Sequence, residues 1–195
     1  MKKVVIASNN THKVEEIKTA LNFEGWEFFT LRECGIESDP DENAETFEGN
    51  ARIKAQAARA ATGFAALADD SGLEIDALNG APGVYSARYA GLPSNDAANN
   101  RKLLAELADV ETINRTGRFV CTLVFLDDDG KETVARGTLE GSIGYEAAGS
   151  EGFGYDPLFY PDVFDGKRSL AQVSQDEKNA ISHRGNALRD LKTKI

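Results

Sequence analysis

Cysteine and histidine are both scarce in this sequence of 195 residues, which contains two of each. Cys34 and Cys121 lie far apart, so they form neither a disulfide framework nor a zinc cluster, and we interpret them as reduced, largely structural thiols. The two histidines, His12 and His183, are too few for a multi-histidine metal centre. This cysteine usage is typical of a cytoplasmic protein.

Long apolar runs and an excess of positive charge are also missing. No apolar stretch approaches the roughly 20 residues that span a bilayer, and residues 4–8 are too short for the apolar region of a signal peptide. Lysine and arginine number 22 against 32 aspartates and glutamates, a net charge of −10. This balance disfavours nucleic acid and anionic membranes as partners, although a local basic pocket can still hold a small anion. We therefore expect a cytoplasmic location.

What the sequence does contain is typical of a globular domain. It is 41% apolar and 28% charged, which excludes disorder, collagen and coiled coil for the chain as a whole. Its length fits a single domain over residues 1–195, large enough to build a hydrophobic core without disulfides or a structural metal.

The spacing of apolar residues predicts alternating strands and helices. Strands are expected over residues 2–8, 26–31, 65–68, 73–78, 118–126 and 132–139, and helices over 13–22, 44–61, 97–107 and 175–192. Asn43 is expected to cap the second helix and Gly63 to end it. The pattern indicates an α/β fold with both parallel and antiparallel pairing, but it does not determine the order of the strands.

The first candidate site lies between the first strand and the first helix. Its residues are Ser8, Asn9, Asn10, Thr11, His12 and Lys13. A helix N-terminus presents unpaired N–H groups and a partial positive charge, so this segment can hold a phosphate. It is not a Walker loop, because it lacks glycine. Simple helix capping explains the same residues equally well.

A pair of aspartates, Asp69 and Asp70, ends a predicted strand and is followed by Ser71 and Gly72. Successive side chains on a strand face opposite sides, so the two carboxylates are not expected to enter one site together. One of them would bind Mg²⁺ or activate water, while its neighbour braces the loop. An ordinary Asp-Ser-Gly turn is the more common origin of such a sequence.

Acidic residues also surround the start of the second predicted helix. Glu45 and Glu48 suit the positive end of the helix dipole, whereas Glu42 precedes the helix and is available as a ligand. Asn50 and Lys54 are four residues apart and share a helix face. Lys54 would reach a cleft from there, although such a lysine more often extends to water.

Two segments near the C-terminus combine aromatic and charged residues. In the first, Phe153 is suited to stack on a nucleobase and Asp156 to accept from ring N–H groups, while Tyr155 is better explained by packing under a loop. The second contains Lys178, His183 and Arg184, which make a positive spot suited to phosphate or to a carbonyl oxygen. Helix capping is the alternative for the second segment.

Together these segments resemble the inosine triphosphate pyrophosphatase family, which hydrolyses non-canonical purine nucleoside triphosphates. The motifs that carry the resemblance are Ser8 to Lys13, Thr46-Phe47-Glu48-Gly49-Asn50-Ala51 with Lys54-Ala55, Ala68-Asp69-Asp70-Ser71-Gly72-Leu73, Gly80-Ala81-Pro82-Gly83-Val84-Tyr85-Ser86-Ala87-Arg88-Tyr89, Phe153-Gly154-Tyr155-Asp156-Pro157 and Ser182-His183-Arg184-Gly185. They keep the family's order over nearly the whole chain. Gly49 departs from the pattern, since the family usually has an acidic residue there.

The resemblance implies Mg²⁺-dependent hydrolysis of a triphosphate to the monophosphate and pyrophosphate, with water attacking the α-phosphorus. It makes Asp70 the general base and a metal ligand and Glu42 the second metal ligand. The alternation of side chains along the strand then assigns Asp69 a supporting role. The substrate-binding residues it implies are Ser8, Asn9, Asn10, Thr11, His12, Lys13, Ser71, Phe153, Gly154, Tyr155, Asp156, Lys178, His183 and Arg184.

The resemblance further implies ITP, dITP and XTP as substrates and a role in removing deaminated purines from the nucleotide pool. A donor such as Arg184 facing the 6-oxo group would reject ATP, because adenine carries a donor at that position. The expected fold is α/β, a central mixed sheet flanked by helices, in two lobes with an active-site cleft between them, and the expected assembly is a homodimer. Two alternatives stay open: a nucleotide-sensing module without turnover, and a pyrophosphatase of broader specificity.

Overall fold

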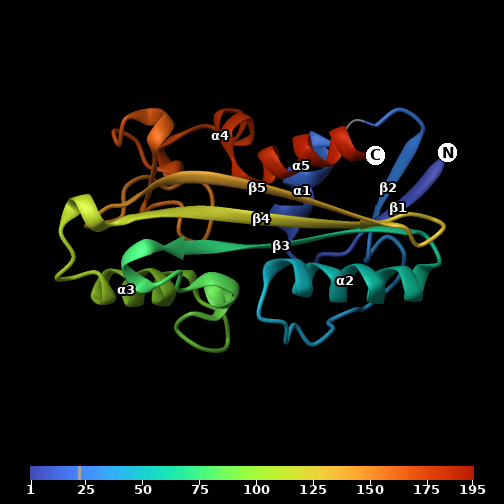
Figure 1. Cartoon of the computed structure of the whole chain (residues 1–195), viewed down its shortest axis with the longest axis horizontal. Helices are drawn as coiled ribbons and strands as arrows, with labels where there is room; N and C mark the ends of the chain where they lie inside the picture. The colour runs from blue at the N-terminus through green and yellow to red at the C-terminus, as the bar shows by residue number, and fades with distance from the viewer. Residues whose placement is uncertain (22) are drawn as a thin grey trace. The chain divides into compact units, whose positions relative to one another are not determined.

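A mixed β-sheet with helices on its faces organises the protein (Figure 1). The computed structural model describes residues 1–21 and 23–195. Within these residues the strand order is β2-β1-β3-β4-β5-β6. Strand β1 pairs in parallel with β2 and β3, while β5 and β6 pair antiparallel, so the predicted mixed α/β sheet is confirmed.

The strands are β1 Lys2–Ile6, β2 Trp26–Thr30, β3 Ala65–Ile75, β4 Thr116–Leu126, β5 Glu132–Ile143 and β6 Phe159–Pro161. The α-helices are α1 Thr11–Ala20, α2 Phe47–Thr62, α3 Asp96–Glu106, α4 Gln175–Ile181 and α5 His183–Lys194. Short 3₁₀ helices span Asp76–Leu78, Gly83–Arg88, Thr112–Asn114, Asp162–Phe164 and Leu170–Gln172. Within the described residues, no helix combines the length and the apolar character needed to cross a membrane.

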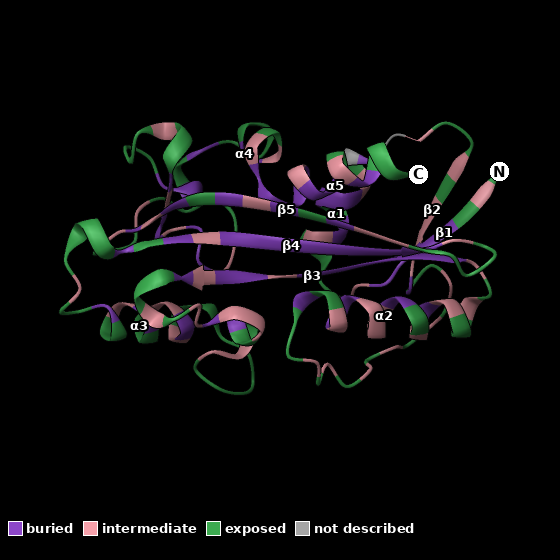
Figure 2. Cartoon of the chain, in the orientation of Figure 1, coloured by how far each residue is buried: buried purple, intermediate pink, exposed green. Residues whose placement is uncertain are grey.

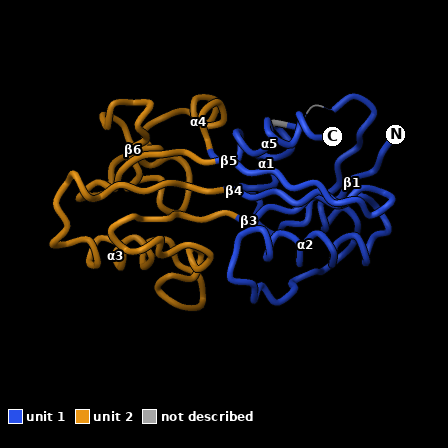
Figure 3. Tube along the Cα trace, in the orientation of Figure 1, with its two compact units in different colours: residues 1–70, 121–137, 183–195 blue, residues 71–120, 138–182 orange. Residues whose placement is uncertain are grey.

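The chain divides into two compact units, drawn in blue and orange in Figure 3. Unit 1 comprises residues 1–70, 121–137 and 183–195, and unit 2 comprises residues 71–120 and 138–182. Strands β3, β4 and β5 each contribute residues to both units. The active-site cleft between two lobes, and the description of residues 1–195 as a single domain, stay predictions.

In unit 1 the sheet is covered on both faces because successive residues of β1 point to opposite sides. Val4 and Ile6 join the cluster formed with α1 and α5, whereas Val5 joins the cluster formed with α2. The face that α2 turns to the sheet consists of Ala51, Ala55 and Ala58, all fully buried. This stripe of small residues therefore lets the helix lie close to the sheet.

Unit 2 has its own apolar core. In Figure 2 the buried residues, drawn in purple, follow the central strands. Leu73 and Ile75 of β3 pack there with Leu103 of α3 and Phe159 of β6. At its edge the buried Arg115 donates to the carbonyl oxygens of Leu107, Ile143 and Gly144 at 2.6 to 2.9 Å. Carbonyl groups at the end of α3 and β5 are satisfied in this way.

Strand β3 corrects the sequence prediction most directly. Two strands over residues 65–68 and 73–78 were expected, with a turn at Ser71 and Gly72, but the structure has one strand from Ala65 to Ile75. The prediction was wrong because turn propensity is local, whereas β3 gains hydrogen-bonded pairing with its neighbours β1 and β4 in the sheet. Asp69 and Asp70 therefore lie inside a strand.

The helix boundaries also differ from prediction. Helix α2 begins at Phe47, three residues later than expected, and its cap is Thr46, whose side chain accepts from the backbone N–H of Gly49. Asn43 is therefore not the cap. Gly63 ends α2 in the left-handed conformation at φ 71°, as predicted. Of the helix predicted over residues 13–22, Asn22 lies outside the described residues.

The single C-terminal helix predicted over residues 175–192 is in fact two helices. Ser182 separates α4 from α5 with an extended backbone, φ −61° and ψ 152°. This break starts a new helix at His183, which places His183 and Arg184 in the first turn of α5. The spacing of polar residues alone does not distinguish one continuous helix from two helices joined at a bend.

Gly137 of β5 sets how closely α5 approaches the sheet within unit 1. A Cβ atom there would fall on the carbonyl oxygen of His183 and the amide nitrogen of Ala187. We expect Gly137→Ala to lower the free energy of unfolding by about 1–3 kcal/mol, because both clashing atoms belong to the backbone. Urea unfolding measures this change. The matched control is Gly63→Ala, which has open space for the Cβ and tests only the strain of a positive φ. Equal losses in the two variants would contradict the close approach.

Candidate active site

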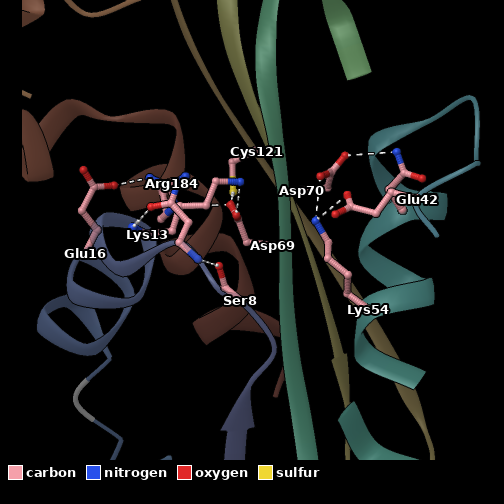
Figure 4. Close-up of polar contacts among 11 residues, drawn as sticks. Ser8, Lys13, Glu16, Glu42, Lys54, Asp69, Asp70, Cys121 and Arg184 are labelled. Atoms are coloured by element: carbon pink, nitrogen blue, oxygen red, sulfur yellow. Dashed lines mark hydrogen bonds and ion pairs between the residues drawn. The ribbon is translucent and has the colours of Figure 1, made fainter. Parts of the chain in front are cut away.

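The two aspartates of β3 point to opposite sides of the strand, as Figure 4 shows. Both are buried, with 1% of Asp69 and 7% of Asp70 exposed. The strand continues through both residues, so the alternation expected from the sequence is confirmed. Each carboxylate therefore has its own set of partners, and unit 1 contains two distinct polar clusters.

On one side, Asp70 and Glu42 converge on a single cation, the ammonium of Lys54 (Figure 4). Lys54 Nζ lies 2.8 Å from Asp70 Oδ1 and 2.9 Å from Glu42 Oε2. Asn50 accepts from the backbone N–H of Ala44 at 2.9 Å and directs its amide toward Asp70 at 3.5 Å. One face of α2 thus holds the loop that carries Glu42 close to β3.

The electrostatics of this cluster are suited to proton transfer near neutral pH. Burial raises the pKa of Asp70 from 3.8 to about 6, against the opposing effect of the Lys54 and Lys13 charges. For Lys54, burial acts against the charged form, but the carboxylates of Asp70, Asp69 and Glu42 outweigh it and raise the pKa. Asp70 can therefore exchange a proton close to working pH while Lys54 stays positively charged.

On the other side of β3, Asp69 is surrounded by positive charge. Its Oδ1 lies 2.6 Å from Lys13 Nζ, and its Oδ2 accepts from Arg184 Nε at 3.2 Å and from Cys121 Sγ at 3.1 Å. Burial acts against the carboxylate, but Arg184 and Lys13 hold the pKa of Asp69 well below 3.8. Asp69 is therefore a permanent anion that braces its neighbours, which agrees with the supporting role expected for it.

The segment before α1 forms the helix cap that the sequence allowed. Asn10 is the N-cap residue, and its side chain accepts from the backbone N–H of Lys13 at 3.1 Å. Ser8 Oγ accepts from the N–H of Asn10 at 3.2 Å, and Asn9 donates to the carbonyl of Ser38 at 2.8 Å. The capping interpretation is confirmed for Asn10. Phosphate binding by this segment stays a prediction.

Thr11 and His12, the first two residues of α1, are both exposed at this end of the helix. Their predicted contacts with substrate are not tested by the arrangement of this segment. Ser71 lies in unit 2 and is partly exposed, and its substrate contact likewise stays a prediction.

Three predicted substrate-binding residues meet within unit 2. Lys178 Nζ lies 2.7 Å from Asp156 Oδ2 and 4.5 Å from the centre of the Phe153 ring. The backbone N–H of Phe153 donates to the same Asp156 oxygen at 2.9 Å. Both charged side chains are almost completely buried. Asp156 thus ties the aromatic loop to α4 and holds an ammonium under the ring.

The rest of the aromatic loop is built into unit 2. Tyr155 is 4% exposed, belongs to the apolar core and donates to the carbonyl of Ser86 at 2.8 Å. Packing under the loop, the sequence alternative for Tyr155, is therefore confirmed, and a direct substrate contact of its side chain stays a prediction. The N–H of Gly154 donates to Asp96 at 2.8 Å, and its carbonyl accepts from Asn100 at 3.0 Å.

The basic pair at the start of α5 is buried, with 6% of His183 and 1% of Arg184 exposed. The Arg184 guanidinium contacts Asp69 and also Glu16 of α1, so both of these carboxylates orient it. Burial acts against the guanidinium, but the nearby carboxylates raise its pKa still further above its ordinary range. Reading of the nucleobase by these two residues stays a prediction.

Sequence reasoning missed three residues of these clusters: Glu16, Asn50 as a bridge to Asp70, and Cys121. Glu16 is three residues after Lys13, so the helical repeat alone would have placed both on one face of α1. Cys121 had no local signal, because its contact with Asp69 joins β4 to β3. Lys54 had been considered for a cleft or for extension to water. The structure places its ammonium between two carboxylates, and its position in a cleft stays a prediction.

The donor set around Asp70 fits Mg²⁺ on chemical grounds. Mg²⁺ prefers oxygen ligands and commonly takes one or two carboxylates, completing its shell with water and phosphate. Glu42 and Asp70 both point at one positive charge, the ammonium of Lys54, so their oxygens already face a common cation. The residues that would hold the ion are therefore Glu42 and Asp70.

Gly49 lies in the first turn of α2, where neighbouring side chains leave no room for a Cβ atom. A Cβ atom would approach Ala44 Cβ to 2.6 Å and Thr46 Oγ1 to 3.1 Å. Ala44 belongs to the segment that follows Glu42, so glycine lets this segment lie against the helix. Any larger residue would require the segment to move outward.

Comparison with known proteins agrees with these observations. The model of the Ham1 family matches residues 4–194. The chain is 48% identical to a dITP/XTP pyrophosphatase of Clostridium perfringens, covering 100% of this chain and 98% of that protein. It is 46% identical to a dITP/XTP pyrophosphatase of Bacillus anthracis, covering 100% and 96%. The solved Ham1 protein of Staphylococcus aureus superposes with a TM-score of 0.88 at 42% identity, covering 98% and 97%.

Proposed function

The chain belongs to the Ham1 family, and from this premise we propose that it hydrolyses non-canonical purine nucleoside triphosphates to the monophosphate and pyrophosphate. It is a hydrolase acting on nucleoside triphosphates, like its dITP/XTP pyrophosphatase relatives. The observation that supports the reaction best is the convergence of Asp70 and Glu42 on one cation. ITP, dITP and XTP are the proposed substrates, and removal of deaminated purines from the nucleotide pool is the proposed role.

The proposed chemistry begins with Asp70. Its carboxylate accepts a proton from the water that attacks the α-phosphorus, and the bond from that phosphorus to the bridging oxygen breaks to release pyrophosphate. Burial raises the pKa of Asp70 to about 6 in the absence of the ion, so the carboxylate is mostly ionised at neutral pH and available as a proton acceptor. Glu42 and Asp70 would hold Mg²⁺, which would supply charge neutralisation for the phosphoryl oxygens.

Other residues bind and orient the substrate in this proposal. The ammonium groups of Lys13 and Lys54 neutralise phosphate charge, and Ser8, Asn9, Asn10, Thr11, His12 and Ser71 donate hydrogen bonds to phosphate or sugar. Phe153 stacks on the base, supported by the loop residues Gly154 and Tyr155, while Asp156, Lys178, His183 and Arg184 recognise the base and phosphates. A donor facing the 6-oxo group excludes adenine.

Pyrophosphate release from ITP, XTP, GTP and ATP, with Mg²⁺ and with excess chelator, tests the proposal. We expect fast, metal-dependent release from ITP and XTP and slow release from GTP and ATP. Comparable rates on all four would indicate a pyrophosphatase of broader specificity. Nucleotide binding without turnover would indicate a sensing module instead. Assembly as a homodimer in the cytoplasm belongs to the same proposal, and sedimentation velocity measures the assembly.

A further inference from the structure

A chain of alternating charges runs through the buried interior of unit 1, from α1 across α5 to β3 and back to α1. Its members, in order of contact, are Glu16, Arg184, Asp69 and Lys13. Glu16 is 7% exposed and the two central residues are 1% exposed, so little water screens the chain. Two carboxylates balance two cations, so each buried charge among these four residues has an opposite charge beside it.

The order of contacts among these four charged side chains determines which cations each carboxylate holds. Asp69 uses Oδ2 for Arg184 and Oδ1 for Lys13, so one carboxylate holds two cations. Glu16 contacts the Nη1 group of Arg184, on a different nitrogen from the one that faces Asp69. Without the charge of Glu16, the guanidinium would shift toward Asp69 and present two of its nitrogens to that carboxylate, since arginine favours bidentate pairing. Lys13 would then lose its place at Oδ1.

We propose that Glu16 is a positioning residue for Lys13: by holding Arg184 from the far side, it keeps one oxygen of Asp69 directed at the Lys13 ammonium. Glu16 acts through the intervening residues and needs no contact with substrate. The inference rests on the proposed function only in that Lys13 binds phosphate. It also explains why Glu16 and Lys13 are three residues apart on α1, since this spacing puts the first and the last of the four charged residues on one helix face.

The first experiment compares Glu16→Gln with Glu15→Gln, its exposed neighbour on the same helix. Both variants remove one negative charge and keep the side-chain volume. We expect kcat/KM for ITP to fall by a factor on the order of 10 to 100 in Glu16→Gln, because displacement of a binding group by about 1 Å has effects of this size. We expect no change in Glu15→Gln.

A double-mutant cycle separates positioning from a merely structural role. Lys13→Met is combined with each glutamine variant, and kcat/KM is measured for all of them. If Glu16 acts through Lys13, the double variant Glu16→Gln/Lys13→Met is no slower than Lys13→Met alone. If the two losses multiply instead, Glu16 does not act through Lys13 and the inference is wrong. The effects of Glu15→Gln and Lys13→Met are expected to be independent.

Glu16→Asp provides a second variant if Glu16→Gln does not fold. Aspartate keeps the charge and loses volume, whereas glutamine keeps the volume and loses the charge. If both variants fold, we expect Glu16→Asp to retain a higher kcat/KM than Glu16→Gln. If only Glu16→Asp folds, we expect its loss of kcat/KM to be non-additive with the loss caused by Lys13→Met. The reverse order, or additive losses in the aspartate cycle, would show that Glu16 only fills space.

Calorimetric binding of inorganic pyrophosphate distinguishes failure of this inference from failure of the proposed function. If the wild-type protein binds pyrophosphate but hydrolyses no triphosphate, the proposed reaction fails, and the same cycle in pyrophosphate affinity still tests Glu16. Non-additive losses of affinity support the inference and additive losses refute it. If the wild type binds no pyrophosphate, Lys13 is not a phosphate ligand and the inference falls as well.

Discussion

Replacing Asp70 with asparagine is expected to reduce pyrophosphate release from ITP by about 10²- to 10⁴-fold, the usual contribution of a positioned general base. Asparagine has nearly the same shape but does not accept the proton of the attacking water. Nucleotide binding should largely survive, because Lys13 and Lys54 remain in place. Single-turnover kinetics and equilibrium binding, measured on the same preparation, separate the two effects. Equal rates in wild type and variant would refute the assignment of Asp70 as the base.

The same substitution is expected to stabilise the folded protein at pH 7. The pKa of Asp70 is about 6 in the folded state against 3.8 ordinarily, so the folded state binds the proton more tightly than the unfolded state does. The stability contributed by this group is therefore present below about pH 4 and is lost as pH rises through about 6. At pH 7 asparagine avoids the cost of burying the charge, which amounts to at most roughly 3 kcal/mol.

Urea unfolding of wild type and Asp70→Asn at pH 4, 6 and 7 measures this effect, with Asp129→Asn on an exposed turn as the control. The advantage of Asp70→Asn should grow from pH 4 to pH 7, while the control should show no such trend. A variant that is less stable than wild type at pH 7 would mean that pairing with Lys54 outweighs the cost of burial.

Asp69→Asn is expected to have the opposite effect on stability, with a loss of about 3–5 kcal/mol at pH 7. This is the usual cost of removing one partner from a buried ion pair. Arg184 would keep only Glu16 as a charged partner among the contacts described above, and Lys13 would lose the carboxylate that lies 2.6 Å away. An uncompensated positive charge would then remain in the interior of unit 1.

The pH dependence of the Asp69→Asn effect follows from the direction of its pKa. Arg184 and Lys13 hold the pKa of Asp69 well below 3.8 in the folded state, so the folded protein binds this proton less tightly than the unfolded chain. The stability contributed by Asp69 is therefore present above about pH 4 and is lost as pH falls through the folded-state pKa. The stability gap between wild type and variant should narrow in acid.

Denaturant unfolding of Asp69→Asn between pH 3 and pH 7 checks this prediction, with Asp70→Asn as the matched neighbour. Two aspartates adjacent in the chain are thus expected to change stability with opposite signs. If both substitutions destabilise the protein equally, the two sides of β3 do not differ as the contacts indicate.

Much of the site was predictable because its signals are local. The alternation of side chains along an extended strand separates Asp69 from Asp70 whatever the rest of the fold does. The N-cap chemistry of Asn10 requires only the four residues around it. The spacing of Ala51, Ala55 and Ala58 follows the helical repeat, so the sequence alone places these small residues on one face of α2.

Other parts of the fold were wrongly predicted where local and long-range preferences compete. Ser71 and Gly72 carry turn propensity, yet they belong to one long strand, because pairing with neighbouring strands outweighs that propensity. Asn43 is as good a cap as Thr46 by residue type. The side chain of Asn50 accepts from the backbone N–H of Ala44, so the segment before Phe47 folds back against α2 and does not continue the helix.

The sequence by itself determined the class of fold, the elements that carry polar residues and the opposite orientation of the two aspartates, since all of these depend on periodicities of two or about four residues. The tertiary structure alone decided which charges meet. Glu16 and Arg184 are 168 positions apart, and Asp69 and Cys121 are 52 apart. The pKa of a carboxylate depends on burial and on charges within a few ångströms. The folded chain buries both aspartates, but the positive charge of Arg184 and Lys13 outweighs burial at Asp69, whereas burial outweighs the lysine charges at Asp70, so the two pKa values shift in opposite directions.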